Sequence, residues 1–128
     1  MKIAFATTDD IHINQHFGWS KAFTLYEIIE NKFSFVKKVD SSLEIEDEID
    51  KLTYKIECLE EVDILVVQQI GPKASRMVQT CGIFPIQTSN NSEKIEDILN
   101  KLILMKENPP IWMKRLLTKN SISHADIL

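Results

Sequence analysis

The chain has 128 residues, of which 44% are hydrophobic and 27% charged, with a formal net charge of −4. This length suggests one domain, and the composition is typical of a soluble globular protein. The negative charge disfavours broad attraction to nucleic acid or to an acidic membrane surface. No apolar stretch approaches the roughly 20 residues that span a bilayer. The strand-like residues from Lys2 onward leave no room for a signal peptide, so we expect a cytoplasmic protein.

The first third of the chain predicts three strands. Residues 2–6 form an apolar run that is typical of a buried strand, and residues 22–29 and 33–39 form the next two. A tight turn at Asn31 and Lys32 joins the second and third strands, so we expect an antiparallel hairpin.

A helix follows the hairpin. The spacing of Ser41 and Glu44 matches a capping box at its start. Apolar residues at helical spacing then mark its buried face: Ile45, Ile49, Leu52, Ile56 and Leu59. The continuous apolar run at residues 63–67 predicts a strand that is buried on both faces of a sheet.

The remaining elements alternate. A second helix begins at Pro72, which suits a first helical position, and ends at Gly82. Its expected apolar face consists of Ala74, Met77, Val78 and Cys81. A short strand at residues 83–87, a third helix at 92–106 and a basic amphipathic turn or two at 111–117 follow. This order predicts an α/β protein with the ribonuclease H-like fold, a mixed five-stranded sheet flanked by about three helices. Residues 1–117 would form a single cofactor-binding domain, and residues 118–128 a flexible tail.

The loop after the first strand holds two of the three histidines, His12 and His16. Imidazole is the commonest metal ligand in proteins. In a loop the spacing of four residues implies no geometry, so one packed and one solvated histidine is the alternative interpretation. His124 lies in the tail and is not expected to contribute.

Five segments together resemble the dinitrogenase iron-molybdenum cofactor biosynthesis family. They are residues 2–9 (KIAFATTD), 14–19 (NQHFGW), 70–74 (IGPKA), 82–86 (GIFPI) and 109–112 (PPIW). The resemblance covers about residues 2–117. Trp19 and the segment at 109–112 favour the NifX-like branch, and the NifB C-terminal domain is a more distant match. The resemblance implies a cysteine just before the fourth strand, but this chain has Val62 there, so no cluster ligand is expected at that position.

The resemblance implies a non-catalytic carrier. Its cargo would be an iron-sulfur precursor of the nitrogenase cofactor, or the iron-molybdenum cofactor itself. It would pass this cargo between nitrogenase cofactor assembly proteins, with neither nucleic acid nor membrane as a partner. We expect a monomer or a weak homodimer.

The order of strands and helices predicts where such an anionic cargo would bind. The histidine loop and residues 68–71 leave the carboxyl ends of the first and fourth strands, which we expect to be parallel neighbours. Ligands of open sheets bind outside such ends, and the second helix begins there with an N-terminus that attracts anions. With the residues implied by the resemblance, the predicted cofactor-binding set is His16, His12, Asn14, Gln15, Phe17, Gly18, Trp19, Gly71 and Lys73. His16 is the first choice as a metal ligand and His12 the second.

The cysteines are expected to lie elsewhere, although thiolate is the usual ligand of iron-sulfur clusters. Cys58 and Cys81 fall near the ends of helices that would run antiparallel to the fourth strand. Both would therefore lie at the sheet edge opposite the histidine loop. Cys81 also lies on the apolar stripe of its helix, which predicts a buried thiol.

Two other functions were weighed. A ribonuclease H-like nuclease needs several carboxylates that converge on divalent metal ions. The core strands offer only Asp9 and Asp10 at one end, with Glu27 isolated, and no Walker or Rossmann glycine pattern is present. A metal-dependent nuclease is therefore the less favoured alternative. A docking or regulatory module of the same fold that binds no cofactor is the other.

Overall fold

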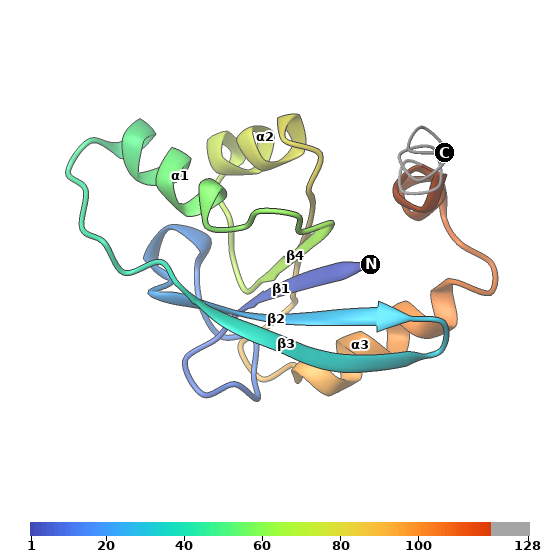
Figure 1. The fold of residues 1–128 in the computed structure, drawn as a ribbon. Helices are drawn as coiled ribbons and strands as arrows, with labels where there is room; N and C mark the ends of the chain where they lie inside the picture. The colour runs from blue at the N-terminus through green and yellow to red at the C-terminus, as the bar shows by residue number, and fades with distance from the viewer. Residues whose placement is uncertain (119–128) are drawn as a thin grey trace.

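The computed structural model describes residues 1–118, which form one five-stranded sheet and the helices packed on it (Figure 1). The strands are β1 (Lys2–Ala6), β2 (Ala22–Ile29), β3 (Lys32–Asp40), β4 (Ile64–Val67) and β5 (Phe84–Gln87). The helices are α1 (Glu48–Glu57), α2 (Pro72–Thr80) and α3 (Ile95–Met105), with a short 3₁₀ helix η1 (Phe17–Trp19). A further helix occupies residues 111–118.

The sheet is mixed, as the sequence predicts. Its order is β3-β2-β1-β4-β5. The three strands from the first third of the chain pair antiparallel, whereas β4 is parallel to both β1 and β5. The carboxyl ends of β1, β4 and β5 therefore lie at one edge of the sheet, and the loops that follow them share that edge.

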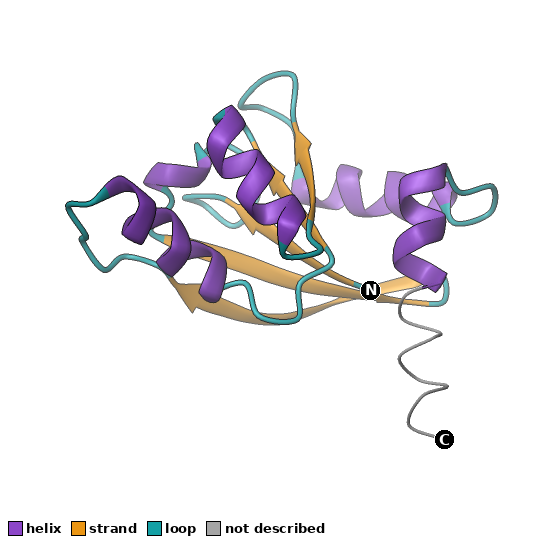
Figure 2. Ribbon diagram, turned by 90° about the horizontal axis from the view of Figure 1, so that it is seen from above, coloured by secondary structure: helices purple, strands orange, loops and turns teal. Residues whose placement is uncertain are grey.

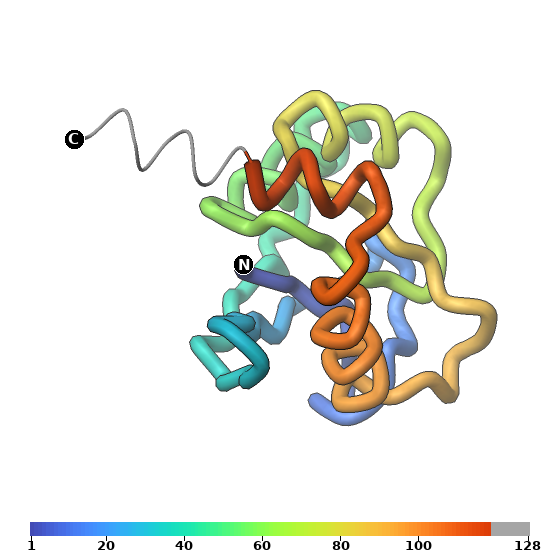
Figure 3. The backbone as a smooth tube through the Cα atoms, turned by 90° about the vertical axis from the view of Figure 1, so that its right-hand side faces the viewer, coloured from blue at the N-terminus to red at the C-terminus, as the bar shows by residue number. Residues whose placement is uncertain are grey.

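The alternation of side chains along β1 divides the core into two layers. Ala4 and Ala6 pack under α1 and α2, while Ile3 and Phe5 pack against α3 and the helix at residues 111–118. Seen from above, α1 and α2 lie side by side over the sheet (Figure 2). The last described helix, red in Figure 3, lies near α3, and its Trp112 stacks on Phe84 of β5 with ring centroids 4.0 Å apart.

The predicted start of α1 is wrong. The helix begins at Glu48, and the Asp47 carboxylate caps it by accepting a hydrogen bond from the Asp50 amide. Ser41 makes no cap because its hydroxyl is buried and donates to the Ser20 carbonyl. As a result Ile45 precedes the helix, and Ile49 is 42% exposed instead of buried.

Smaller differences occur at other ends. The turn between β2 and β3 falls at Glu30 and Asn31, and Glu30 adopts a positive φ of 56°. Helix α3 begins at Ile95, because the Ser92 amide and hydroxyl bond to the Asn90 side chain in a local turn. The prediction that Gly82 ends α2 in a left-handed conformation is confirmed by its φ of 82°. Within residues 1–118, no helix has the length and apolar character needed to cross a membrane.

Candidate functional site

The loop between β1 and β2 wraps around the carboxyl end of β4. The Phe17 amide donates to the Gln69 carbonyl at 2.9 Å, and the Gln68 amide donates to the Gln15 carbonyl at 3.0 Å. These bonds continue the parallel pairing of β1 and β4 beyond the strands. The structure thus confirms that the histidine loop lies beside the segment that leads into α2.

The loop also passes from one face of the sheet to the other. Ile13 is buried in the layer of α3, whereas Phe17 is buried in the layer of α1 and α2. The Ile13 amide donates to the Glu93 carbonyl, which ties the first half of the loop to the segment before α3. His12 accordingly forms a backbone bridge with Lys94, while His16 forms one with Gln69. The two histidines are therefore held by different neighbours.

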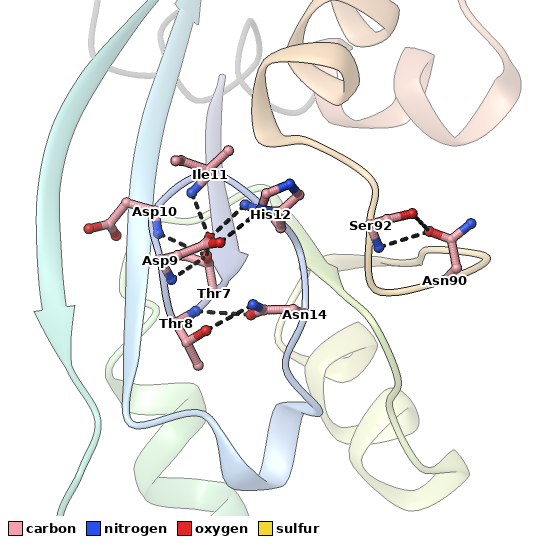
Figure 4. A network of polar contacts seen from close by, with 9 residues as sticks. All are labelled: Thr7, Thr8, Asp9, Asp10, Ile11, His12, Asn14, Asn90 and Ser92. Atoms are coloured by element: carbon pink, nitrogen blue, oxygen red, sulfur yellow. Dashed lines mark hydrogen bonds and ion pairs between the residues drawn. The ribbon is translucent and has the colours of Figure 1, made fainter.

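His12 is held by a carboxylate. Its Nδ1 lies 2.7 Å from Asp9 Oδ2, and Asp9 Oδ1 accepts the amides of Ile11 and His12 (Figure 4). The hydrogen bonds from the His12 amide and then from its ring hold the pKa of Asp9 well below its ordinary value. Asp9 is therefore an anion at neutral pH and only accepts. The ring must donate from Nδ1, so in the neutral imidazole the lone pair is on Nε2.

This arrangement is the one that metal-binding histidines use, in which a carboxylate fixes the ring and leaves the other nitrogen for the metal. From the sequence alone, Asp9 is expected only as one of the few carboxylates available to a nuclease, and His12 as the weaker of the two metal ligands. The spacing of Asp9 and His12 is the signal that could have found the pair. An aspartate often accepts amides two and three residues on, and that turn brings the histidine ring to the same carboxylate.

His16 is held by an aromatic ring. It stacks on Trp19, with centroids 4.5 Å apart and an angle of 8° between the rings. Trp19 is 68% exposed. Within the described part of the chain, neither ring nitrogen of His16 takes part in a hydrogen bond, so both are available to a ligand.

Three other predicted site residues have structural tasks. The Asn14 side chain accepts the Thr8 amide and donates to the Thr8 hydroxyl, and thereby closes the loop. Phe17 is fully buried in the core. Gln15 contributes its carbonyl to the Gln68 amide. These residues position the histidines, and Figure 4 shows the Asn14 contacts beside those of Asp9.

The start of α2 lies next to His16. Gly71 is the N-cap residue and makes no side-chain cap, Pro72 takes the first turn, and Lys73 is exposed. The free amides of that turn attract anions. A Cβ at Gly71 would meet nothing within 4 Å, and one at Gly18 would meet only the Lys51 ammonium at 3.9 Å. Both glycines leave open space at this edge.

Asp10 is already occupied by protein groups. Its carboxylate accepts the Thr24 hydroxyl at 2.7 Å and the Lys38 ammonium at 3.2 Å, and the Thr24 bond is the main cause of its lowered pKa. Across residues 1–118, no three His, Cys, Asp or Glu side chains are grouped so that they could hold a metal ion. Any metal bound by the described residues would therefore depend on isolated ligands such as the two histidines.

The two cysteines differ from expectation. Cys81 does lie at the opposite edge, in a pocket with Met1 and Asp63, but it is exposed because it follows the last turn of α2. Cys58 lies elsewhere than predicted. Its Sγ is 3.6 Å from the carbonyl of Asp40, the last residue of β3. Because β3 and β1 run in the same direction, this residue lies at the same edge of the sheet as the carboxyl end of β1. His124 falls outside the described residues.

The sheet order and connectivity define a small α/β protein whose histidine loop lies at the carboxyl ends of β1 and β4. A family model described as dinitrogenase iron-molybdenum cofactor matches residues 1–105. The chain therefore belongs to the dinitrogenase iron-molybdenum cofactor family, as its motifs predict.

Named relatives of this chain are NifX proteins. The Herbaspirillum seropedicae protein is 36% identical over 122 residues, which cover 93% of this chain and 83% of that protein. The Azotobacter vinelandii protein is 28% identical over 120 residues, covering 93% and 76%. The crystal structure of a protein designated PH0822 superposes with a TM-score of 0.63 at 23% identity over 80% of this chain and 88% of that one, which supports the fold. The family and the NifX relatives support a role in the biosynthesis of the nitrogenase iron-molybdenum cofactor.

Proposed function

We propose that this protein is a non-catalytic carrier. Its cargo is an iron-sulfur precursor of the iron-molybdenum cofactor, or that cofactor itself, and it passes the cargo between nitrogenase cofactor assembly proteins. The observation that carries the proposal is the Asp9–His12 pair, which leaves the Nε2 lone pair free for a metal on the same loop as His16. The proposed iron ligands are His16 and His12.

The surroundings of His16 suit an anionic cluster. The uncapped amides at the start of α2 and the charge of Lys73 lie beyond Gln69, to which His16 is bridged. An exposed anion at a helix N-terminus gains about 0.3–1 kcal/mol. Such a contribution is small, so the imidazoles would supply most of the affinity. Two ligands of this kind suit a cargo that is to be released again.

The nuclease alternative lacks support. Asp9 is engaged by His12 and Ile11, and Asp10 by Thr24 and Lys38. Both carboxylates are thus hydrogen-bonded to other protein groups, and among residues 1–118 no third His, Cys, Asp or Glu side chain is grouped with them to hold a metal ion. The remaining alternative is a docking module that binds no cargo, and the binding experiment below distinguishes it from the carrier.

The test is anaerobic gel filtration of the full chain mixed with the isolated precursor cluster. We expect iron to co-elute with the protein at one cluster per chain. We expect the combined change His12→Ala and His16→Ala to abolish co-elution. The variant Cys58→Ser with Cys81→Ala serves as the control, since it alters the thiols alone. Absence of iron in the protein peak of the unaltered chain would support the docking module instead.

A further inference from the structure

A groove is lined in part by Trp19, the residue whose ring stacks on His16. It has a volume of about 290 Å³ and lies between η1, the segment at residues 41–45 and α1. Its lining includes three lysines, Lys21, Lys51 and Lys55, with Trp19 and a single acidic residue, Glu44. Figure 1 shows η1 as the unlabelled blue helical turn below α1.

Lys55 is a buried cation without a counter-ion. Only 4% of the residue is exposed. Its ammonium donates to the carbonyls of Ser20 and Ser41 at 2.5 and 2.9 Å. Both acceptors are neutral, and one of the three N–H donors is left over. Burying an ammonium without an anionic partner is costly.

Lys51 adds to this charge instead of compensating it. It lies four residues before Lys55 on the same side of α1, and its ammonium approaches Gly18. Burial, and then the positive charge of Lys51, lower the pKa of Lys55. Neither Glu44 nor any of the three lysines takes part in an ion pair among residues 1–118. With three lysines and one glutamate, the lining of the groove carries a net positive charge.

We propose that this groove binds a small free oxyanion, a carboxylate or phosphate compound, between the ammonium groups of Lys51 and Lys55, with the exposed ring of Trp19 as one wall. The volume equals about ten water molecules at roughly 30 Å³ each, which suits a compound of a few carbon atoms or inorganic phosphate. Lysine binds such groups as a point charge with rotatable donors. The site is distinct from the imidazole nitrogens and does not require the carrier function.

The chain offers an internal reporter for this site. It has two tryptophans, and Trp112 is stacked on Phe84 on the other side of the sheet. The variant Trp112→Phe leaves Trp19 as the single indole, and its fluorescence reports on the groove. We would titrate this protein with inorganic phosphate and, separately, with succinate, each at constant ionic strength maintained with chloride.

We expect a saturable change in Trp19 fluorescence with one of the two anions, and the tighter binder identifies the group that the site prefers. Lys51→Gln should weaken binding by about tenfold or more, as for the loss of a charged hydrogen bond. Lys21→Gln, at an exposed position, provides a second variant that does not disturb buried structure. Lys101→Gln, exposed on α3, is the matched control and should bind like the parent. The proposal is overturned if neither anion gives saturation up to about 10 mM, or if Lys51→Gln and Lys21→Gln both bind like Lys101→Gln.

Discussion

The carboxylate of Asp9 lies 2.7 Å from Nδ1 of His12 and simultaneously accepts the backbone amides of Ile11 and His12. One side chain therefore shapes the loop and selects the ring nitrogen that stays free. Loop geometry and metal-ligand geometry are coupled through this single residue.

This coupling predicts the effect of Asp9→Ala. Loss of the carboxylate frees the ring to rotate and removes the preference for a proton on Nδ1, so cluster affinity should fall by about 10- to 100-fold. Nitrogen NMR of the histidine ring would show the tautomer directly. The matched control is Asp10→Asn, at a neighbouring carboxylate that contacts Thr24 and Lys38 instead. If the two variants bind the cluster with equal affinity, the Asp9–His12 pair has no role in cluster binding.

The same carboxylates predict a dependence of stability on pH. Hydrogen bonds hold the pKa of both Asp9 and Asp10 below the ordinary value of an aspartate, 3.8. A lowered pKa means that these groups stabilise the fold above the unfolded-state pKa, and that this stability is lost as the pH falls below about 4. Urea unfolding between pH 6 and pH 2 should show the loss. In the double variant Asp9→Asn with Asp10→Asn, the free energy of unfolding should depend less on pH in this range. The same pH dependence in variant and parent would show that these two carboxylates do not cause the loss.

His16 can be tested with a substitution that keeps the stack. His16→Phe preserves an aromatic ring against Trp19 but has no nitrogen to donate. If His16 ligates iron, this variant should lose more affinity than one neutral hydrogen bond provides, about 0.5–1.5 kcal/mol. If His16 only braces the loop, His16→Phe should bind like the parent, and its melting temperature should also match. Binding by the unaltered chain should weaken in acid, because a protonated imidazole has no lone pair to donate to the metal.

The cysteines should differ in reactivity. Cys81 is exposed after α2, whereas Cys58 is partly buried and its Sγ contacts the Asp40 carbonyl. A thiol reagent in excess should therefore modify Cys81 first, with two separable rates. The variant Cys58→Ser with Cys81→Ala should keep most of the cluster affinity. Loss of affinity in a folded double variant would assign a ligand to one of the thiols.

The start of α1 gives a test of the fold. Asp47→Ala should lower the free energy of unfolding by about 0.5–2 kcal/mol, as is usual for loss of an N-cap. Glu44→Ala, at the other end of the predicted capping box, should change it little, because Glu44 lies outside the helix. Equal effects of the two substitutions in denaturant unfolding would show that the helix begins earlier.

The strands of the sheet were predictable because each is a short run of apolar residues bounded by a turn or loop in the sequence. Residues 22–29 were predicted as a strand and form β2 with those bounds. The start of α1 was not predictable, since Ser41 and Asp47 are both good N-cap residues. Which of the two caps the helix depends on the hydrogen bond from Ser41 to the Ser20 carbonyl, which joins residues that are distant in the sequence. Similarly, the apolar stripe of α2 predicts a buried Cys81, but the helix ends one residue earlier and the thiol turns outward.

At the site, the sequence predicted that the histidine loop would lie beside the start of α2, because parallel strands share an edge. It did not predict how each imidazole is held. The stack of His16 on Trp19 depends on the short turn of η1, and the bond of His12 depends on the turn at Asp9. Both are local side-chain arrangements within a loop, where residue spacing alone fixes no geometry.

The proposed carrier binds iron of its cargo through an imidazole nitrogen of His12 or His16. The most direct measurement is pulsed electron paramagnetic resonance of the anaerobic complex in a paramagnetic state of the cluster, with protein labelled at histidine with ¹⁵N. We predict a ¹⁵N coupling to the cluster that disappears in the variant with His12→Ala and His16→Ala. A stable complex without any ¹⁵N coupling would contradict the account.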